Sequence, residues 1–387
     1  MPELPEVHRA ANLLRSLTLG RRITKVVTND DTIVFAGVTH EEFAKELTNR
    51  TVTNVGRYGK NFYMELNEKC RTPVMHFGMT GMLQVRGELP IHYRETPRKA
   101  STDWPPRFMK FVMHIEPEDS TPSTPTVCTE IAFLDARRLG RIRLVSGSPL
   151  ESPPISNLGF DPVLSMPDLP TFSSLLLKRS CPIKALLLNQ SFSAGVGNWV
   201  ADEVLYHAGV HPEQRCRTLS EEQVEKVWKW TSEICRIAVD VNADDEKFPE
   251  DWLFKHRWGK GKSKKGKAAE ALKLPSGEPA TIKWVTVGGR TSAYVAELQQ
   301  LPSSATVKDG ILVNDEPNES DLTPISEPDT EIAVNTIGKK RKASAATENK
   351  QTKPKRATCS NSKAADHATD DKKSVTRSRA VRAKAKK

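Results

Sequence analysis

The sequence predicts an α+β fold, in which an N-terminal helix and a β-sandwich or flattened barrel precede a helical domain, a β-hairpin and a disordered basic tail. One helical segment opens the chain, many short strand-like segments follow it, and amphipathic helical segments come next. So many short strands after a single helix favour a β-sandwich or a flattened barrel. We expect domains at residues 1–148 and 155–301, joined by the proline-rich stretch 149–154, and a tail at 302–387.

The first half of the chain supplies the predicted sandwich. A helix is expected from Leu4 to Leu17, where apolar residues recur at helical spacing. Residues 22–27 and 32–38 are β-branched runs around a short polar turn, and they predict a hairpin. Thr39 begins a second predicted helix with the spacing of a capping box. The further predicted strands are 52–58, 61–66, 73–77, 82–86, 108–115, 127–134 and 142–145.

The second half predicts helices and a hairpin. Helices are expected over 182–190, from 198 onward, and over 219–239, where apolar residues form one face. Residues 281–298 are two β-prone runs around a Gly-Gly turn, which predicts a hairpin. The stretch 255–267 carries seven Lys or Arg among glycines. It could follow a DNA backbone or be simply solvated.

The N-terminus places a secondary amine beside a carboxyl group. Initiator methionine is normally removed before a small residue, which leaves Pro2 with a free imino group of pKa near about 8. A neutral imino group can attack an electrophilic carbon and gives a charged iminium directly, while Glu3 can move protons. The same residues also suit the start of a helix, and both interpretations can hold together.

Apolar stretches and cysteines limit the class of protein. No stretch of the 387 residues approaches the roughly 18 apolar residues of a membrane span. No N-terminal segment is typical of a secretory signal, and the six cysteines show no paired spacing. We therefore expect a reducing compartment, no metal, no cofactor and no membrane partner.

The net charge of +10 is distributed unevenly. Residues 339–387 carry 17 Lys or Arg against 4 Asp or Glu, a net charge of +13, whereas residues 306–338 carry −7. Residues 1–305 have only +4, so DNA binding there must depend on particular residues. The tail lacks hydrophobic periodicity, which predicts disorder. Its basic runs 339–342 and 353–356 are typical of nuclear import signals or nonspecific DNA tethers, so we expect a nuclear protein.

Two motifs resemble the formamidopyrimidine-DNA glycosylase family. Met1-Pro2-Glu3-Leu4-Pro5-Glu6-Val7 resembles the family's N-terminus, and Gly195-Val196-Gly197-Asn198 with the helix after it resembles the family's helix-two-turns-helix segment. The resemblance covers residues 1–301. It implies an N-terminal two-layered β-sandwich capped by the N-terminal helix, followed by a helix-two-turns-helix domain that ends in a finger at 281–299. It also implies a base-excision-repair enzyme, a bifunctional DNA glycosylase and AP lyase that acts on oxidised purines or abasic sites in double-stranded DNA. We expect a monomer.

The resemblance implies roles at the reaction centre. Pro2 would attack C1′ of the damaged nucleotide and form a Schiff base, while Glu3 passes protons as the base departs. Lys60, in a glycine-lysine turn, would assist β-elimination, and Arg290 would assist δ-elimination. Without the resemblance, Lys60 would be interpreted as a solvated hairpin lysine.

The resemblance also implies DNA contacts. Met79 and Arg137 would fill the gap left by an extruded base. The family usually has phenylalanine where this chain has Leu139, so the second wedge is apolar without being aromatic. Lys184, and backbone amides at the start of the Asn198 helix, would hold phosphates.

The finger departs from the bacterial pattern. Its arginine, Arg290, would grip phosphates that flank the lesion. Bacterial members usually build this finger on four cysteines, and residues 281–299 contain none. The chain is therefore similar to the plant and fungal branch, whose finger is zincless.

Two other functions were weighed. A tautomerase with an N-terminal proline also begins Met-Pro, but such chains are short and lack the Asn198 motif. A noncatalytic damaged-DNA-binding protein could retain the helix-two-turns-helix, although Pro2, Glu3 and Lys60 are all present. The preferred oxidised base and the preferred opposite base stay open.

Overall fold

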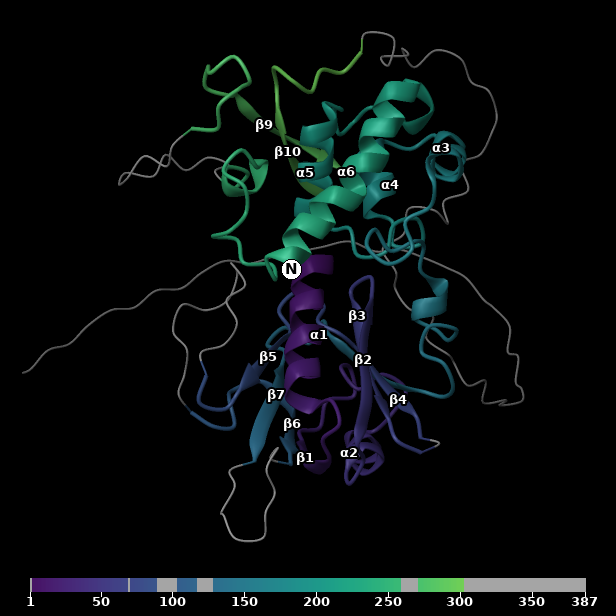
Figure 1. Cartoon of the computed structure of the whole chain (residues 1–387), viewed down its shortest axis with the longest axis vertical. Helices are drawn as coiled ribbons and strands as arrows, with labels where there is room; N and C mark the ends of the chain where they lie inside the picture. The colour runs from purple at the N-terminus through teal and green to yellow at the C-terminus, as the bar shows by residue number, and fades with distance from the viewer. Residues whose placement is uncertain (1, 69, 89–102, 117–127, 259–270, 303–387) are drawn as a thin grey trace, which may run out of the picture. The chain divides into compact units, whose positions relative to one another are not determined.

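The computed structural model describes residues 2–68, 70–88, 103–116, 128–258 and 271–302 (Figure 1). The predicted tail from residue 303 and most of the basic stretch 255–267 lie outside these ranges. Within them, no helix is long and apolar enough to cross a membrane.

Two four-stranded antiparallel sheets form the predicted sandwich, with strand orders β1-β6-β7-β5 and β2-β3-β4-β8. The strands are β1 (Ile23–Thr28), β2 (Val52–Tyr58), β3 (Asn61–Leu66), β4 (Thr72–His76), β5 (Met82–Val85), β6 (Met109–Ile115), β7 (Thr129–Leu134) and β8 (Arg141–Val145). The predicted strands from residue 52 onward correspond to β2–β8 within two residues at each end.

The predicted hairpin between 22–27 and 32–38 is wrong. β1 pairs with β6, and residues 32–38 form turns with a single isolated bridge, from Phe35 to Ile142. The cause is Asp31, whose carboxylate accepts hydrogen bonds from the backbone N–H groups of the next turn at 3.2 Å. Such aspartate turns compete with strand pairing.

The helices are α1 (Leu4–Thr18), α2 (His40–Leu47), α3 (Leu169–Leu177), α4 (Ile183–Leu188), α5 (Asn198–Ala208) and α6 (Glu221–Asp240). The capping box predicted at Thr39 is confirmed, because its hydroxyl accepts from Glu42 N at 3.1 Å and Glu42 accepts from Thr39 N at 2.9 Å. α3 was not predicted. Shorter 3₁₀ turns lie at Ile155–Asn157, Cys216–Thr218 and Leu253–Lys255.

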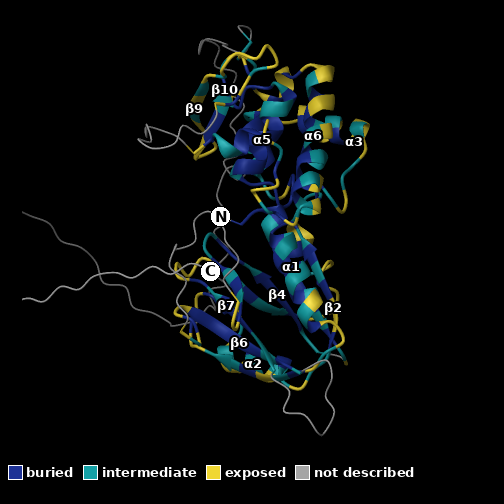
Figure 2. Cartoon of the chain, turned by 60° about the vertical axis from the view of Figure 1, so that its left-hand side comes forward, coloured by how far each residue is buried: buried dark blue, intermediate teal, exposed yellow. Residues whose placement is uncertain are grey.

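α1 belongs to two apolar cores. Leu4 packs with the buried residues of α3–α6, whereas Val7 and Leu14 pack with the sandwich. All three side chains are fully buried. Figures 1 and 2 show α1 running from the helical part down along the sandwich. One helix therefore ties the two parts together through its own first turn.

The finger is a hairpin of β9 (Ile282–Val287) and β10 (Arg290–Val295). Gly288 and Gly289 have φ of +55° and +68°, as a two-residue type I′ turn requires. Arg290 directly follows this turn as the first residue of β10, where it pairs with Val287.

Candidate active site

The N-terminal segment packs against the turn that precedes α5. Leu4 N donates to Gly195 O at 3.1 Å. A Cβ on Gly195 would lie 2.8 Å from Leu4, and a Cβ on Gly197 would lie 2.2 Å from the carboxyl carbon of Glu3. Both glycines are therefore needed so that the N-terminal segment can approach this closely.

Glu3 caps the start of α5. Its two carboxylate oxygens accept hydrogen bonds from the backbone N–H groups of Trp199 at 2.9 Å and Val200 at 3.1 Å. A carboxylate at this position also benefits from the positive end of the helix. Glu3 therefore occupies two of the backbone amides at the start of this helix, and the phosphate contact at Asn198 stays a prediction.

Pro2 is buried next to Glu3. Behind them, Glu6 accepts from Glu3 N at 2.8 Å and from the Trp199 indole N–H at 3.1 Å. Burial and the nearby Glu3 charge raise the pKa of Glu6 to about 7. Pro2 thus lies beside two carboxyl groups, one of which titrates near neutral pH.

Lys60 meets the same turn from the sandwich. Its ammonium is buried and donates to Val196 O at 3.0 Å. Burial lowers the pKa of this ammonium, although the Glu3 and Glu6 carboxylates favour its charged form. Gly59, at φ +57°, lets the backbone reach Ala194, and its N–H donates to the buried Asp161 carboxylate at 2.8 Å.

Pro2 and Glu3, adjacent at the start of the chain, therefore meet the distant residue Lys60 at one turn. The Gln190 side chain supports this turn with two hydrogen bonds. Its amide donates to Val196 O at 2.9 Å and its oxygen accepts from Gly195 N at 3.0 Å. The sequence motif around Gln190 was recognised, but the role of the Gln190 side chain follows only from the folded structure.

Two loops leave the sandwich beside this site, 77–81 with Met79 and 135–140 with Arg137 and Leu139. They touch, because a Cβ on Gly78 would lie 2.3 Å from the Leu139 backbone. Leu139 is 40% exposed, Arg137 is exposed and Met79 is half-buried. The three predicted wedge residues thus lie at the same end of the sandwich.

One buried carboxylate, Asp135, holds both loops. It accepts from the Thr80 hydroxyl at 3.0 Å in the first loop, and from Gly140 N at 2.6 Å and Arg137 N at 3.2 Å in the second. Asp135 is fully buried. Sequence reasoning gave it no role, although an acid that opens a loop with two arginines is a signal for such an anchor.

Lys184 does not lie where a phosphate contact would need it. Its side chain is fully buried, and its ammonium donates to the Asp202 carboxylate and to Asn198 O. The predicted phosphate contact of Lys184 is therefore not supported by this arrangement. The sequence around Lys184 did not indicate its ion-pair partner, because Asp202 lies on the next helix, α5.

Asp202 is the centre of a buried ion network. Its carboxylate is bound by Lys184 from α4 and by Arg257, whose Nε lies 3.0 Å away. It also accepts from Ala293 N of β10 at 3.2 Å. Asn198 adds a second link to the finger, since its side-chain amide donates to Thr291 O at 3.0 Å. The finger is fastened to α5 next to Arg290, which is exposed.

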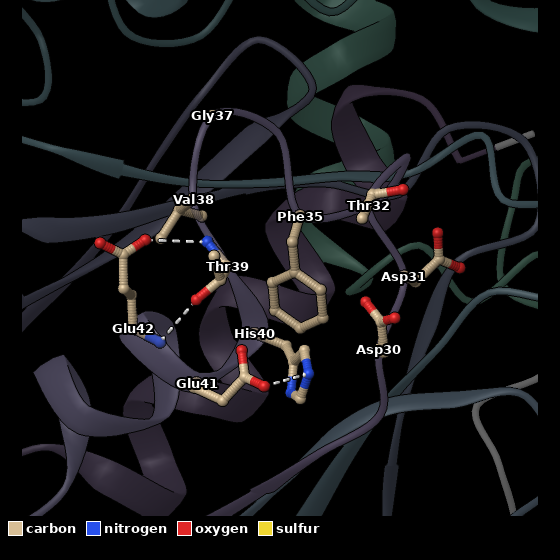
Figure 3. A pocket seen from close by; sticks show the side chains of 10 residues that line it. All are labelled: Asp30, Asp31, Thr32, Phe35, Gly37, Val38, Thr39, His40, Glu41 and Glu42. Carbon is tan, nitrogen blue, oxygen red and sulfur yellow. Dashed lines mark hydrogen bonds and ion pairs between the residues drawn. The ribbon is translucent and has the colours of Figure 1, made fainter.

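A cavity of about 430 Å³ lies elsewhere, at the start of α2 (Figure 3). Its polar lining is mostly acidic, and His40 Nε2 there lies 2.8 Å from the Glu41 carboxylate. None of the residues at the N-terminal site lines it. Among the described residues, no group of three or more His, Cys, Asp or Glu side chains is arranged to hold a metal ion.

Both parts of the molecule match models of known families. Residues 1–142 match the formamidopyrimidine-DNA glycosylase N-terminal domain, and residues 158–249 match the formamidopyrimidine-DNA glycosylase H2TH domain. A formamidopyrimidine-DNA glycosylase of Arabidopsis thaliana is 37% identical over 301 residues, covering 78% of this chain and 71% of the relative. The chain belongs to the formamidopyrimidine-DNA glycosylase family.

More distant relatives of this family agree. The formamidopyrimidine-DNA glycosylase of Bacillus subtilis is 28% identical over 247 residues, or 62% of this chain and 79% of the relative. The crystal structure of the Lactococcus lactis enzyme, bound non-covalently to DNA with an AP site, has a TM-score of 0.58 at 23% identity. It covers 77% of this chain and 99% of that one. The predicted α+β fold, with its N-terminal sandwich and its H2TH domain, and the family resemblance are confirmed.

The raised pKa of Glu6 predicts a pH dependence of stability. An unfolded glutamate titrates near about 4.3, so ionising Glu6 in the fold costs stability as the pH rises toward about 7. The free energy of unfolding should fall by on the order of 1–3 kcal/mol between about pH 5 and pH 8. Glu6→Gln should remove most of this slope in urea titrations. The exposed Glu225→Gln should retain it, and an unchanged slope in Glu6→Gln would contradict the assignment.

Proposed function

We propose that the protein is a bifunctional DNA glycosylase and AP lyase of base-excision repair, which removes oxidised purines from double-stranded DNA. The observation that carries the proposal is the meeting of Pro2, Glu3 and Lys60 at the turn before α5. An N-terminal secondary amine beside a carboxylate and a lysine is suited to Schiff-base chemistry.

The damaged nucleotide must leave the helix first, because C1′ of a stacked nucleotide is out of reach of an enzyme nucleophile. Met79, Arg137 and Leu139 emerge together from one end of the sandwich and would fill the vacated space. Asp135 holds their two loops as one unit, so the three side chains enter the duplex together.

The chemistry begins when the neutral Pro2 nitrogen forms a bond to C1′ and the glycosidic bond breaks. The base leaves with the bonding electrons and takes up a proton from solvent. Glu3 accepts the proton that the Pro2 nitrogen loses and passes it to the sugar ring oxygen as the ring opens to an iminium. Loss of a proton from C2′ then expels the 3′ phosphate, and a second elimination expels the 5′ phosphate. Lys60, held beside Glu3, is placed to assist the first elimination, and Arg290 the second.

A noncatalytic damaged-DNA-binding protein is the second candidate. It would account for the wedge loops and the finger equally well. It would give no reason for an ammonium to be buried at Lys60 beside the N-terminus, because desolvating a charge is costly unless its position serves a purpose.

Borohydride trapping tests the enzyme proposal. Reduction of the iminium should join the protein covalently to a duplex that contains 8-oxoguanine, a formamidopyrimidine or an abasic site. A protein whose Pro2 nitrogen is acetylated should form no adduct, since the nucleophile is blocked. Glu3→Gln should bind an abasic-site duplex but trap lesion DNA at least about 100-fold more slowly, as expected when a positioned general acid is lost. Adduct formation by the acetylated protein would overturn the assignment of Pro2.

We also propose that the finger is held without zinc, by the Asp202 network. Residues 281–299 contain no cysteine. Instead of a metal site, the buried Asp202 carboxylate, which lies between Lys184 and Arg257, accepts a hydrogen bond from Ala293 N. The Asn198 side-chain amide donates to Thr291 O. These links hold β10 against α5 and so position Arg290 at the site.

Chelation and a local stability measurement test this proposal. EDTA should leave DNA cleavage unchanged. Asp202→Asn removes the counter-charge of Lys184 and Arg257, so amide hydrogens of β10 should exchange at least about tenfold faster while those of β7 are unaffected. Arg290→Ala should weaken DNA binding without this effect. Loss of cleavage in EDTA that zinc restores would show that the finger has been misassigned.

We further propose that the basic tail directs the protein to the nucleus and strengthens nonspecific DNA binding. Residues 339–387 carry a net charge of +13, which can release counterions from DNA. All residues assigned to the reaction lie before residue 302, so the tail has no part in the chemistry.

Removing residues 339–387 should therefore change binding and location but not chemistry. Binding to an undamaged duplex should depend less steeply on salt, because fewer phosphates are neutralised. The single-turnover rate on a lesion duplex at saturation should be unchanged, and a fluorescent fusion should lose nuclear enrichment. Normal binding with no cleavage at saturation would instead place the tail in the active assembly.

A further inference from the structure

We propose that Phe108 is a further DNA-contacting residue, whose ring supplies the aromatic surface that Leu139 lacks. The inference rests on the proposed function, since its partner is the same damaged duplex. Phe108 lies just before β6 and has no counterpart among the wedge residues recognised from the sequence.

The register of the sheet brings Phe108 to the wedge loops. Leu134, the last residue of β7, pairs with Met82 at the start of β5 and with Met109 at the start of β6. The segments that precede Met82, precede Met109 and follow Leu134 therefore leave the sheet at the same end. These segments carry Met79, Phe108 and Leu139, respectively.

A backbone hydrogen bond confirms that Phe108 lies next to the wedge loops. The backbone N–H of Asp135 donates to Phe108 O at 3.1 Å. Asp135 is the residue whose carboxylate holds both wedge loops. Phe108 is thus attached to the same anchor as Met79 and Leu139.

Phe108 is presented to solvent at a conformational cost. Its φ is +68°, a left-handed conformation that a bulky aromatic residue rarely adopts. Its exposure is 47%, so burial of the ring in the core does not offset that cost. Strained residues of this kind persist where the surrounding structure holds them, and they cluster at binding and catalytic sites.

The chemistry of the pair Arg107-Phe108 suits a nucleic acid. The Arg107 guanidinium lies 4.6 Å from the centre of the Phe108 ring. An exposed ring can stack on an unstacked base or enter an opened base step, and a guanidinium beside it can meet a phosphate. Leu139, 40% exposed, supplies apolar surface without this stacking. Phe108, at the same end of the sheet, supplies the aromatic surface that Leu139 lacks.

Three variants test the inference by their dissociation constants for a duplex with a tetrahydrofuran abasic analogue opposite cytosine. Phe108→Asn keeps a residue that tolerates positive φ and removes the ring, so the dissociation constant should rise about tenfold while Tm is not lowered. Phe108→Trp keeps an aromatic surface and should bind within about twofold of the wild type.

Leu150→Ala is the matched control. Leu150 is also 47% exposed, but it follows the last residue of β8, whereas the wedge loop with Leu139 precedes the first residue of that strand. It should bind as the wild type does. Wild-type affinity in Phe108→Asn would overturn the inference, and so would a loss of affinity accompanied by a lowered Tm, which would make Phe108 a packing residue. Either result would leave borohydride trapping by the wild-type protein intact. Failure of the wild type itself to bind and trap would instead refute the proposed function.

Discussion

The structure depends most on the contact between the Glu3 carboxylate and the first backbone amides of α5. This contact satisfies N–H groups that a helix start leaves unpaired, and it fixes the N-terminus at the same time. It requires Gly197, because any side chain there would collide with Glu3. A single carboxylate therefore acts both as a helix cap and as the support of a reactive terminus.

Two buried carboxylates organise the rest of the site. Asp161 pairs with Arg57 and binds Gly59 N, which fixes the turn that carries Lys60. Asp202 pairs with Lys184 and Arg257 and binds β10, which fixes the finger. Charges buried in this way are stable only as complete sets, since removal of one partner leaves another charge desolvated. Such networks specify position more than they add stability.

Local patterns in the sequence predicted most of the strands and helices, because alternation, capping and glycine turns are read from neighbouring residues. They failed at 32–38, where a buried side chain overrides β propensity. At α3 the Asp168 cap and Pro170 in the first turn mark a helix start, but these signals were overlooked. At the site, Pro2, Glu3 and Lys60 were recognised by motif. Lys184 was misjudged because its partner, Asp202, is supplied by another helix. Asp135 was missed because one of its partners, Thr80, lies in a loop that is distant in sequence, and Phe108 because strand register brings it to the wedge loops.

The shared position of α1 has a mechanical consequence. Leu4 is part of one core and Val7 of the other, so hinging the two parts would draw Leu4 out of its apolar surroundings. The protein thus resists bending between its two parts, and on binding to damaged DNA the deformation would fall on the DNA. Duplex stiffness varies with sequence, pyrimidine–purine steps being the most easily kinked. The flexibility of the base steps around a lesion, more than motion within the protein, would then govern how readily that lesion is engaged.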